Sequence, residues 1–318
     1  MSFTSKVKTE LANRISNAKH CRVAEIAALI SMCGNVQIDE FDNYRVFVQT
    51  DTKMTATKFR ELLWKTFHID TDVEEKENKL ARANKSFVVE IKSSEDSLMV
   101  LKETKIMNDQ DVVEEQMDIS KNSILKRDCC RRAYLRGAFM SSGTVNNPEK
   151  SYHFEIKCIN ENKAKQIEDL FESFDIKPKI IRRKEKYIVY LKESEKVSAA
   201  LNVIDAPISM MEVENVIINK YMVNKVNRQM NCDSANIKKT VNAARKQIED
   251  IEYIDSEIGI ENISDKLQVV ARARLANPEV GIQELGELMD PPLGKSGVNH
   301  RLRKISEIAE ELKTEKKA

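Results

Sequence analysis

The chain has 318 residues, which is enough for two or three domains with a substantial core. Its charged fraction of 32%, its few glycines and prolines and its formal net charge of +1 indicate a soluble, helix-rich globular protein and argue against a long disordered arm. No stretch is long and apolar enough to span a membrane, and charged residues interrupt the N-terminal segment, so we expect no signal peptide, no membrane contact and a cytoplasmic location.

The segment Ser2–Ala18 is predicted to be an amphipathic helix, since Val7, Leu11 and Ile15 recur at helical spacing. This spacing calls for burial, and we expect the helix to pack on the repeat that follows it. A free recognition arm is the alternative, and the apolar spacing disfavours it.

Two later stretches, Val23–Val36 and Arg131–Val145, share one plan: a short helix, small and apolar on one side, leads into a strand. Gly137 lies inside the second helix, where the missing side chain lets another backbone come close. Gly34 and Gly143 end the two runs, and we expect each to supply a left-handed stop. Two helices of this kind are suited to pack against one another.

The same order of strand, helix, strand and helix is expected after each of these helices. The predicted elements are Tyr44–Thr50, Thr55–Phe67, Ser86–Ile91 and Asp96–Ile106 after Gly34, and Ser151–Ile159, Lys163–Phe174, Lys186–Leu191 and Lys196–Val203 after Gly143. The pattern predicts an internal duplication of an α-β-β-α-β-β-α unit, with repeats at about 20–108 and 127–210 in a domain 1–222. Glu74–Lys85 is expected to be a solvated loop, and the acidic Asp109–Asp118 joins the repeats.

The two helices resemble the paired LAGLIDADG motifs of homing endonucleases, whose last residue before the final glycine is an Asp or Glu that holds a divalent metal. Aligned on the glycines, this position is Cys33 in the first repeat and Ser142 in the second. A neutral thiol or hydroxyl does not supply the hard oxygen ligand that Mg²⁺ needs for phosphodiester hydrolysis. We therefore expect a retained scaffold without catalytic residues, bound metal or cofactor.

The cysteines and histidines give no pattern of metal ligands. The six cysteines include no CxxC pair, which argues against a zinc site, and the four histidines are scattered along the chain. We expect reduced cytosolic thiols.

Basic residues gather in the second repeat, where Arg131, Arg132 and Arg136 open the motif and more follow in Lys177–Lys186. Because the overall charge is near zero, we interpret these residues as solvated surface balanced by nearby acids. Contact with DNA phosphates across a saddle-shaped pair of sheets is the alternative.

From about Met211 the pattern becomes unbroken helix, and a second, all-α domain is predicted for residues 223–318. Its first part is rich in basic residues, which include Arg228, Lys238 and Lys239, whereas Glu249–Glu261 is acidic. This reversal indicates a surface directed at an anion, with salt-linked helices facing solvent as the alternative.

The last segment predicts a helix-turn-helix. The expected helices are Ile263–Ala276, Ile282–Met289 and Val298–Leu312, and the loop Asp290–Lys295 is longer than usual for this motif. The buried stripe of the third helix is predicted to be Val298, Leu302, Ile305, Ile308, Ala309 and Leu312.

The other side of the third helix carries Asn299, His300 and Arg303. Asn and Arg are the residue types that read adenine and guanine edges in the major groove through pairs of hydrogen bonds. A helix that enters the groove needs such donors near its N-terminal end. This side therefore predicts sequence-specific binding to double-stranded DNA.

The residues around this helix start are suited to phosphates. Ser296 and the backbone amides after it are placed to take a phosphate, and Lys295, Arg301 and Lys304 are predicted to hold the DNA backbone. No acidic residue lies between Lys295 and Lys304, which a purely structural three-helix bundle does not explain.

A degenerate LAGLIDADG pair followed by a helix-turn-helix is similar to the WhiA regulators of Gram-positive bacteria. The likeness is clearest in Arg131–Val145, in Val226–Asn236 with Gln247–Ile251, and in Asp290–Ile305. The resemblance implies an α+β fold, a duplicated LAGLIDADG-type domain followed by an all-α helix-turn-helix domain. It implies a nucleoid-associated transcriptional regulator linked to cell division and chromosome segregation, and to sporulation in some relatives. It also implies RNA polymerase holoenzyme or a WhiB-type iron–sulfur protein as partners.

Two alternatives remain open. The first is a working LAGLIDADG-type DNA endonuclease that depends on a divalent metal and whose acids have moved to Glu25 or Glu155. The second is a protein- or ligand-docking platform, in which Cys33 and Ser142 leave an uncharged groove at the former metal position.

Overall fold

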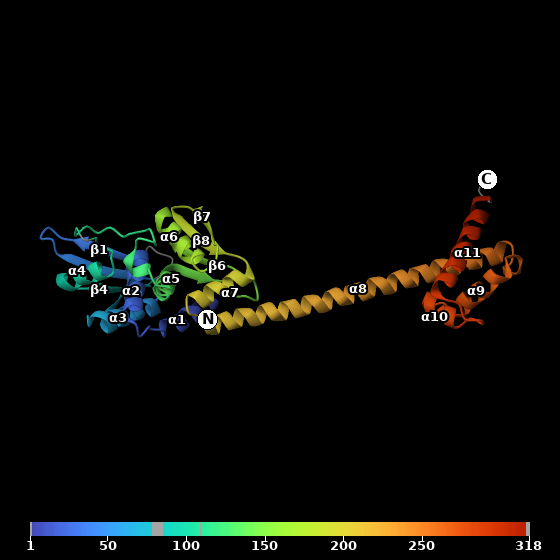
Figure 1. Cartoon of the computed structure of the whole chain (residues 1–318), viewed down its shortest axis with the longest axis horizontal. Helices are drawn as coiled ribbons and strands as arrows, with labels where there is room; N and C mark the ends of the chain where they lie inside the picture. Colours follow the sequence, from blue (N-terminus) through green and yellow to red (C-terminus); the bar gives the residue numbers. More distant parts are fainter. Residues whose placement is uncertain (1, 78–84, 109, 316–318) are drawn as a thin grey trace. The chain divides into compact units, whose positions relative to one another are not determined.

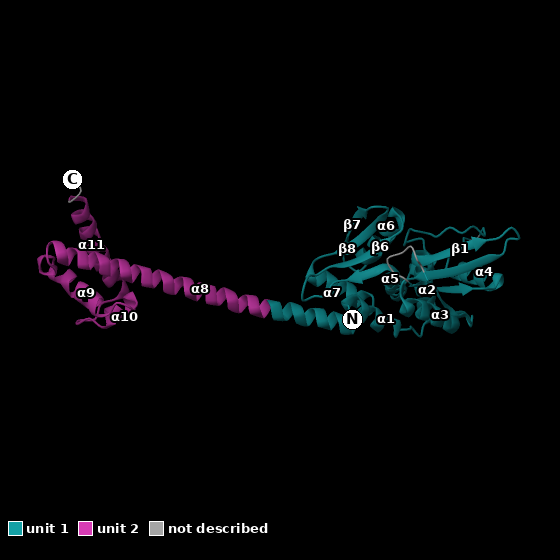
Figure 2. Ribbon diagram, turned by 180° about the vertical axis from the view of Figure 1, so that it is seen from behind, with its two compact units in different colours: residues 1–220 teal, residues 221–318 magenta. Residues whose placement is uncertain are grey.

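The computed structural model describes residues 2–77, 85–108 and 110–315, and the chain divides into the units Met1–Lys220 and Tyr221–Ala318 (Figure 2). The first repeat consists of α2 (Lys19–Cys33), β1 (Gly34–Ile38), β2 (Tyr44–Thr50), α3 (Lys53–Phe67), β3 (Val73–Glu77), β4 (Lys85–Ile91) and α4 (Ser94–Glu103). A 3₁₀ turn, η1 (Ser123–Leu125), precedes the second repeat, which consists of α5 (Asp128–Ser142), β5 (Gly143–Val145), β6 (Phe154–Cys158), α6 (Glu161–Glu172), β7 (Lys179–Arg183), β8 (Lys186–Leu191) and α7 (Ser194–Val203). Both repeats hold a four-stranded antiparallel sheet, in the orders β1-β2-β4-β3 and β5-β6-β8-β7, which confirms the predicted duplication.

The outer edge of the first sheet differs from the prediction. Part of Glu74–Lys85, expected to be a solvated loop, forms β3, which pairs antiparallel with β4. Residues 78–84 of that segment lie outside the described residues. Most of β3 is exposed, because an edge strand packs little and tolerates charged side chains on both faces.

The glycines that end the motif helices do not adopt the left-handed conformation, so that expectation was wrong. Gly34 and Gly143 have φ angles of −91° and −75°, in the extended region. Glycine is required at both positions because there is no space for a side chain. A Cβ at Gly34 would lie 2.4 Å from the Ile30 carbonyl oxygen, and one at Gly143 would lie 2.2 Å from the Phe139 ring. Each motif helix therefore passes straight into β1 or β5.

Helices α2 and α5 lie side by side in the middle of the first unit (Figure 1). They approach most closely at Gly137, where a Cβ would lie 2.7 Å from the Glu25 carbonyl oxygen and 2.8 Å from Ala28 Cβ. Residues of both helices, such as Leu29 and Phe139, belong to one hydrophobic cluster that runs through both repeats. The repeats therefore share a single core.

A buried ionic network crosses this helix pair. The Glu25 carboxylate, whose side chain is 0% exposed, lies 2.6 Å from Lys58 Nζ and 2.8 Å from an Arg136 Nη atom. The second Nη of Arg136 donates to Asp205 at 2.5 Å. Arg136 is 3% exposed, so its interpretation as solvated surface, and the alternative of phosphate contact, are both wrong. Each buried charge of this network has an oppositely charged partner, which offsets part of the cost of burying it.

Helix α1 (Phe3–Ala12) is shorter than the predicted helix and contacts both repeats, not the first alone. The Thr4 hydroxyl donates to the Val145 carbonyl oxygen at 2.7 Å and accepts from the Val145 amide at 2.9 Å. At the other end, Lys58 Nζ donates to the Leu11 carbonyl oxygen. The apolar residues Val7 and Leu11 are buried, as expected.

The second unit is all helical, as predicted, and its core is separate from that of the first unit. Its elements are the part of α8 (Pro207–Glu257) from residue 221 onward, the 3₁₀ turn η2 (Ile260–Asn262), α9 (Asp265–Ala276), α10 (Ile282–Glu287) and α11 (Lys295–Glu315). Among the described residues, no helix combines the length and the apolar character needed to cross a bilayer.

We expect Glu25→Gln to lower the free energy of unfolding of the first unit by about 3–5 kcal/mol, because it leaves the buried Lys58 without its anion and leaves Arg136 with Asp205 alone. Trp64 is the only tryptophan in the chain and lies in α3, so its fluorescence during urea denaturation follows this unit. The control is Glu40→Gln, at an exposed position, where a change within about 0.5 kcal/mol is expected. Equal effects of the two substitutions would contradict the assigned role of the network.

Candidate nucleic-acid interface

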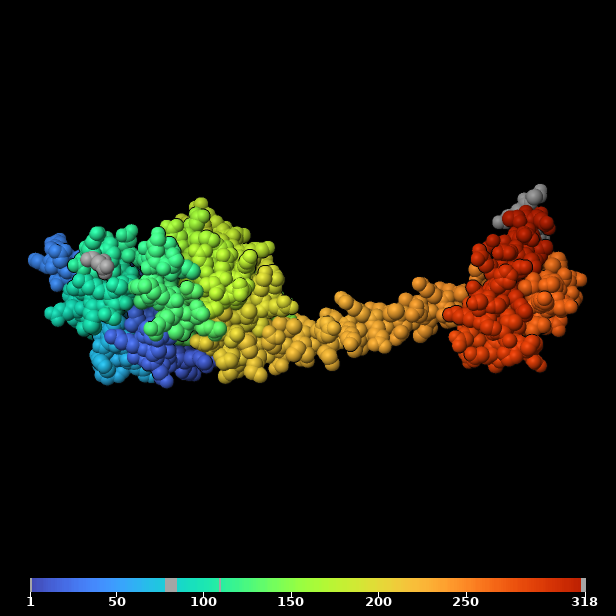
Figure 3. Space-filling view, in the orientation of Figure 1, coloured from blue at the N-terminus to red at the C-terminus, as the bar shows by residue number. Residues whose placement is uncertain are grey.

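Helix α11 packs on α9 and α10 through its apolar stripe. Val298, Leu302, Ile305 and Ala309 are buried, as predicted, whereas Ile308 and Leu312 are only partly buried. The remaining sides of α11 lie at the surface of the second unit, where the helix is red in the space-filling view (Figure 3).

The connection between α10 and α11 folds back and contacts α10. The Leu293 amide donates to the Gly286 carbonyl oxygen at 2.9 Å, and a Cβ at Gly286 would lie only 2.0 Å from the Leu293 carbonyl oxygen. On the other side of α10, the buried Arg274 of α9 donates to the carbonyl oxygen of Val280, in the turn between α9 and α10, at 2.7 Å. These contacts set where α11 begins, which is Lys295 and not Val298 as predicted.

The structure places most of the predicted α11 residues on the surface. Those that are exposed are Lys295, Ser296, Asn299, His300, Arg303 and Lys304. Arg301 is half-buried, and its guanidinium donates to the Lys266 carbonyl oxygen at 3.4 Å. Arg303 lies 3.6 Å from Glu307 in an exposed ion pair, which contributes little and is readily exchanged for another anion.

The start of α11 is open to an anion. Lys295 and Ser296 are its first two residues, and its first turn contains no acidic residue. The first amides of a helix lack partners inside the helix and carry the positive end of its dipole. The local geometry therefore offers unpaired amides, a hydroxyl and an ammonium group at one place.

The three basic residues predicted on α8 are exposed as well. Arg228, Lys238 and Lys239 lie in the stretch 221–243, every residue of which is exposed. Further along the chain, the acidic part of α8 contacts the C-terminal half of α11, where Lys313 Nζ donates to the buried Asp250 at 2.9 Å. The structure thus separates the acidic part of α8, which packs on α11, from its exposed basic part.

The former metal positions of the LAGLIDADG motif hold neutral side chains that are already engaged. The Cys33 thiol donates to the Leu29 carbonyl oxygen at 3.2 Å, and the Ser142 hydroxyl donates to the Lys157 carbonyl oxygen at 2.8 Å. Burial raises the pKa of Cys33 to about 12, so this thiol stays protonated at neutral pH. This donor set does not fit Mg²⁺, which takes hard oxygen ligands such as carboxylates.

A lysine lies beside these positions, so the expectation of an uncharged groove was wrong. Lys8 of α1 is 7% exposed and interacts electrostatically with Cys33, Asp51 and Lys157. Burial lowers the pKa of Lys8 to about 8, so the group is still largely protonated at pH 7. The positive charges of Lys8 and Lys157 oppose a divalent cation at this place, against the nearby carboxylate of Asp51.

The two acids considered as relocated metal ligands are both occupied. Glu25 is enclosed by Lys58 and Arg136 in the middle of the helix pair. Glu155 accepts from Thr144 at 3.1 Å and lies 3.0 Å from His153 Nε2.

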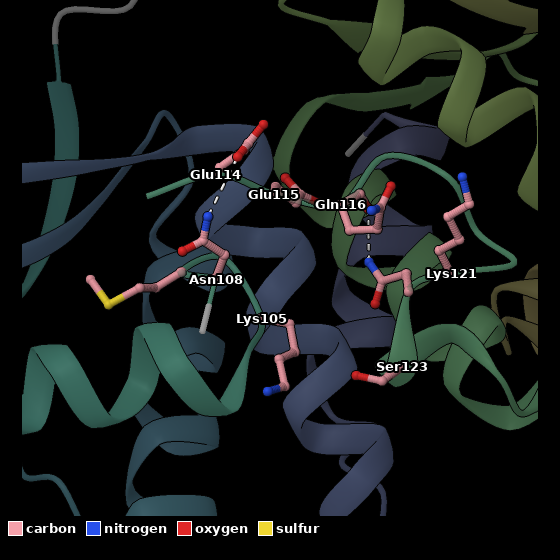
Figure 4. Close-up of a pocket in the computed structure, with 9 residues that line it drawn as sticks. Lys105, Asn108, Glu114, Glu115, Gln116, Lys121 and Ser123 are labelled. Atoms are coloured by element: carbon pink, nitrogen blue, oxygen red, sulfur yellow. Dashed lines mark hydrogen bonds between the residues drawn. The ribbon is translucent and has the colours of Figure 1, made fainter. Parts of the chain in front are cut away.

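The acidic segment between the repeats contains a contact that sequence reasoning missed. The Glu115 carboxylate accepts from Ser31 at 2.5 Å, and from Tyr134 and the buried Lys163 at 2.7 Å each. Together with its neighbours it lines a cavity of about 590 Å³ (Figure 4). The segment therefore folds back over the helix pair and pairs a buried ammonium. A lysine in the apolar face of the α6 helix was the signal that a partner existed.

Three family models match the chain. They describe the WhiA N-terminal LAGLIDADG-like domain, matched by residues 19–107, the WhiA LAGLIDADG-like domain, matched by residues 131–223, and the WhiA C-terminal HTH domain, matched by residues 226–309.

Curated relatives match over nearly their whole length. The chain is 40% identical to the "Probable cell division protein WhiA" of Lachnoclostridium phytofermentans, over 98% of this chain and 100% of the relative. It is 41% identical to the protein of the same name from Lachnospira eligens, over 98% of each chain. Among solved structures, full-length WhiA from Thermatoga maritima matches with a TM-score of 0.59 at 23% identity, over 98% of this chain and 99% of that one, which shows a shared fold.

The low pKa of Lys8 predicts a pH-dependent stability. In the unfolded chain Lys8 keeps its usual pKa of 10.5, so between pH 8 and 10.5 the unfolded chain binds more protons than the folded protein. The free energy of unfolding contributed by this group therefore rises with pH across that window. We expect Lys8→Met to be more stable than the parent at pH 7, by up to about 3 kcal/mol, and to lose most of this advantage by pH 10.

The measurement is urea denaturation at several pH values, with the difference between parent and variant taken at each. Lys6→Met, at an exposed lysine of the same helix, is the control for general charge effects. If the difference in free energy of unfolding between Lys8→Met and the parent stayed constant from pH 7 to 10, the pKa of Lys8 would not be lowered on folding. The prediction would then be wrong.

Proposed function

This chain belongs to the WhiA family, and from that premise we propose that it is a sequence-specific DNA-binding protein that regulates transcription in cell division and chromosome segregation and is not a nuclease. One observation carries the DNA-binding part of the proposal. The exposed side of α11 between Lys295 and Lys304 has basic and amide side chains and no acid, while its other side is anchored in a helix-turn-helix.

On this proposal α11 enters the major groove. Asn299, His300 and Arg303 are exposed near its N-terminal end, which is the part of a recognition helix that reaches base edges. Asn and Arg discriminate bases because each offers two hydrogen-bonding groups in the geometry of one base edge. The exposed Arg303–Glu307 ion pair is weak, so little free energy is lost when Arg303 leaves Glu307 to bind a guanine.

Phosphates hold the protein in register. Lys295, Ser296 and the open amides at the start of α11 take one phosphate, and Arg301 and Lys304 contact the DNA backbone further along the helix. The exposed Arg228, Lys238 and Lys239 of α8 add a second, sequence-independent contribution to affinity.

The location and partners follow from the same premise. A DNA-binding regulator is placed in the cytoplasm at the nucleoid. RNA polymerase holoenzyme or a WhiB-type iron–sulfur protein is proposed as its partner on the strength of the family resemblance. The names of the relatives, which are called probable cell division proteins, support the proposed role in cell division. Co-purification of the protein from cells would identify the partner.

Single substitutions on α11 separate base reading from backbone contact. Arg303→Ala should weaken binding to the best site by about 1–3 kcal/mol and relax the base preference at one position. Lys304→Ala should weaken binding evenly across sequences and reduce the slope of log affinity against log salt by about 1. Fluorescence anisotropy with the preferred duplex and a scrambled duplex measures both quantities.

The control is Arg272→Ala, which removes the same charge from an exposed position of α9. Its effect should be smaller than that of Arg303→Ala and should leave base preference unchanged. Equal losses for all three variants on both duplexes would mean that α11 does not read sequence.

Incubation of the full chain with supercoiled plasmid and Mg²⁺ or Mn²⁺ should leave the plasmid intact. The reason is that Cys33 and Ser142 supply no carboxylate and that Lys8 lies beside them. Agarose electrophoresis detects nicked and linear products, and a commercial nuclease on the same plasmid is the positive control. Cleavage that disappears in Glu155→Gln would contradict the proposal.

A further inference from the structure

The amino-terminal ends of α2 and α5 bring together four side chains that are far apart in the sequence. His20 and Cys21 are the second and third residues of α2, and Cys129 and Cys130 are the second and third residues of α5. Their ligand atoms, three Sγ atoms and a ring nitrogen, all lie within 4.8 Å of one another. Within residues 2–77, 85–108 and 110–315, no other group of three or more His, Cys, Asp or Glu residues comes together in this way.

The spacing is close to that of a tetrahedral ion. Bonds of about 2.3 Å from Zn²⁺ to sulfur and about 2.0 Å to nitrogen place neighbouring ligand atoms about 3.5–3.8 Å apart. His20 Nδ1 lies 3.1 Å from Cys130 Sγ and 3.3 Å from Cys21 Sγ. Cys21 and Cys130 are buried, whereas His20 and Cys129 are exposed, so solvent borders the cluster on their side. Small side-chain movements therefore complete the coordination shell.

Positive charge surrounds the cluster and opposes the effect of burial, which favours the neutral thiol. The positive ends of two helix dipoles meet at the cluster, and a helix N-terminus stabilises a thiolate. Lys19, Lys126 and Arg127 line a cavity of about 570 Å³ that also reaches His20 and Cys130. A complex of Zn²⁺ with three thiolates carries one negative charge, which these basic groups offset.

A second opening reaches the cluster from another side. A cavity of about 390 Å³ is lined by Cys21 and Cys129 together with Arg132 and Arg136. An ion therefore has a path to the buried thiols through solvent-accessible space.

Binding of a cation must displace protons. All six cysteines are free thiols, burial raises the pKa of Cys130 to about 12, and burial raises the pKa of Cys21 as well. Metal affinity at such a site increases with pH, because only the thiolate is a ligand.

We propose that His20, Cys21, Cys129 and Cys130 form a Zn²⁺ site that links the two repeats. Four protein ligands close the coordination sphere, which is the arrangement of a structural and not a catalytic zinc site. Two ligands come from each repeat, so the ion cross-links α2 to α5 at their amino-terminal ends. The expectation from cysteine spacing, that the chain has no zinc site, considered neighbours along the sequence only.

Cobalt titration of the full chain tests the proposal. The protein is reduced, stripped with a chelator and titrated with Co²⁺ under nitrogen. We expect one equivalent to produce the thiolate-to-cobalt charge-transfer band and the visible bands of a tetrahedral site, and one equivalent of Zn²⁺ to abolish them. Zn²⁺ should also raise the midpoint of thermal unfolding followed by Trp64 fluorescence.

Cys129→Ser and His20→Asn are the test variants because both positions are exposed and neither should disturb folding, which circular dichroism checks. Both should lose the tetrahedral spectrum and the thermal shift. Cys232→Ser, at an exposed cysteine of α8 outside the cluster, is the matched control and should keep them. Cobalt spectra that are the same in Cys129→Ser and the parent would overturn the proposal. Absence of the charge-transfer band would also overturn it, and so would the formation of a disulfide among these cysteines in place of Co²⁺ binding.

Discussion

The close packing of α2 on α5 is the constraint on which the rest of the first unit depends. At Gly137 the two helices come so near that no side chain fits, and beside this point Glu25 is neutralised by Lys58 from one repeat and Arg136 from the other. Buried ion pairs add little stability over an apolar core, but mispairing leaves charges without partners. The network thus restricts how the helices can be aligned, and alignment at the centre places the side chains at both ends of the pair.

Much of the fold could be predicted from the sequence because its signals are local or repeated. Helical spacing of apolar residues located α3, α9 and α10 to within a few residues, and the recurrence of one order of elements revealed the duplication. The outward side of α11 was predictable for the same reason: the buried stripe determines which residues face solvent. In each case the property read from the sequence is the one that decides the structure.

The parts that were missed depend on contacts between distant segments. Strand β3 is charged and lies at an edge, so alternation of apolar residues does not mark it. The partner of Lys163 is Glu115, which lies in a segment that looks like an exposed acidic link. The grouping of His20 with the cysteines of α5 becomes visible only once α2 and α5 are paired, although both helices carry potential ligands at their second and third positions. An alignment of the two repeats residue by residue was the available signal.

The connection between α10 and α11 has many residues, but its two ends lie close together. The hydrogen bond from Leu293 to Gly286 closes the intervening residues into a side loop, whose tip at Asp290 and Pro292 is exposed. Helix α11 is therefore positioned by the base of that loop, where the Leu293 carbonyl rests on Gly286, and not by the number of residues in it. Insertions or substitutions at the tip of this loop therefore leave the position of α11 unchanged. A side chain at residue 286, in contrast, would collide with the Leu293 carbonyl and displace the start of the helix.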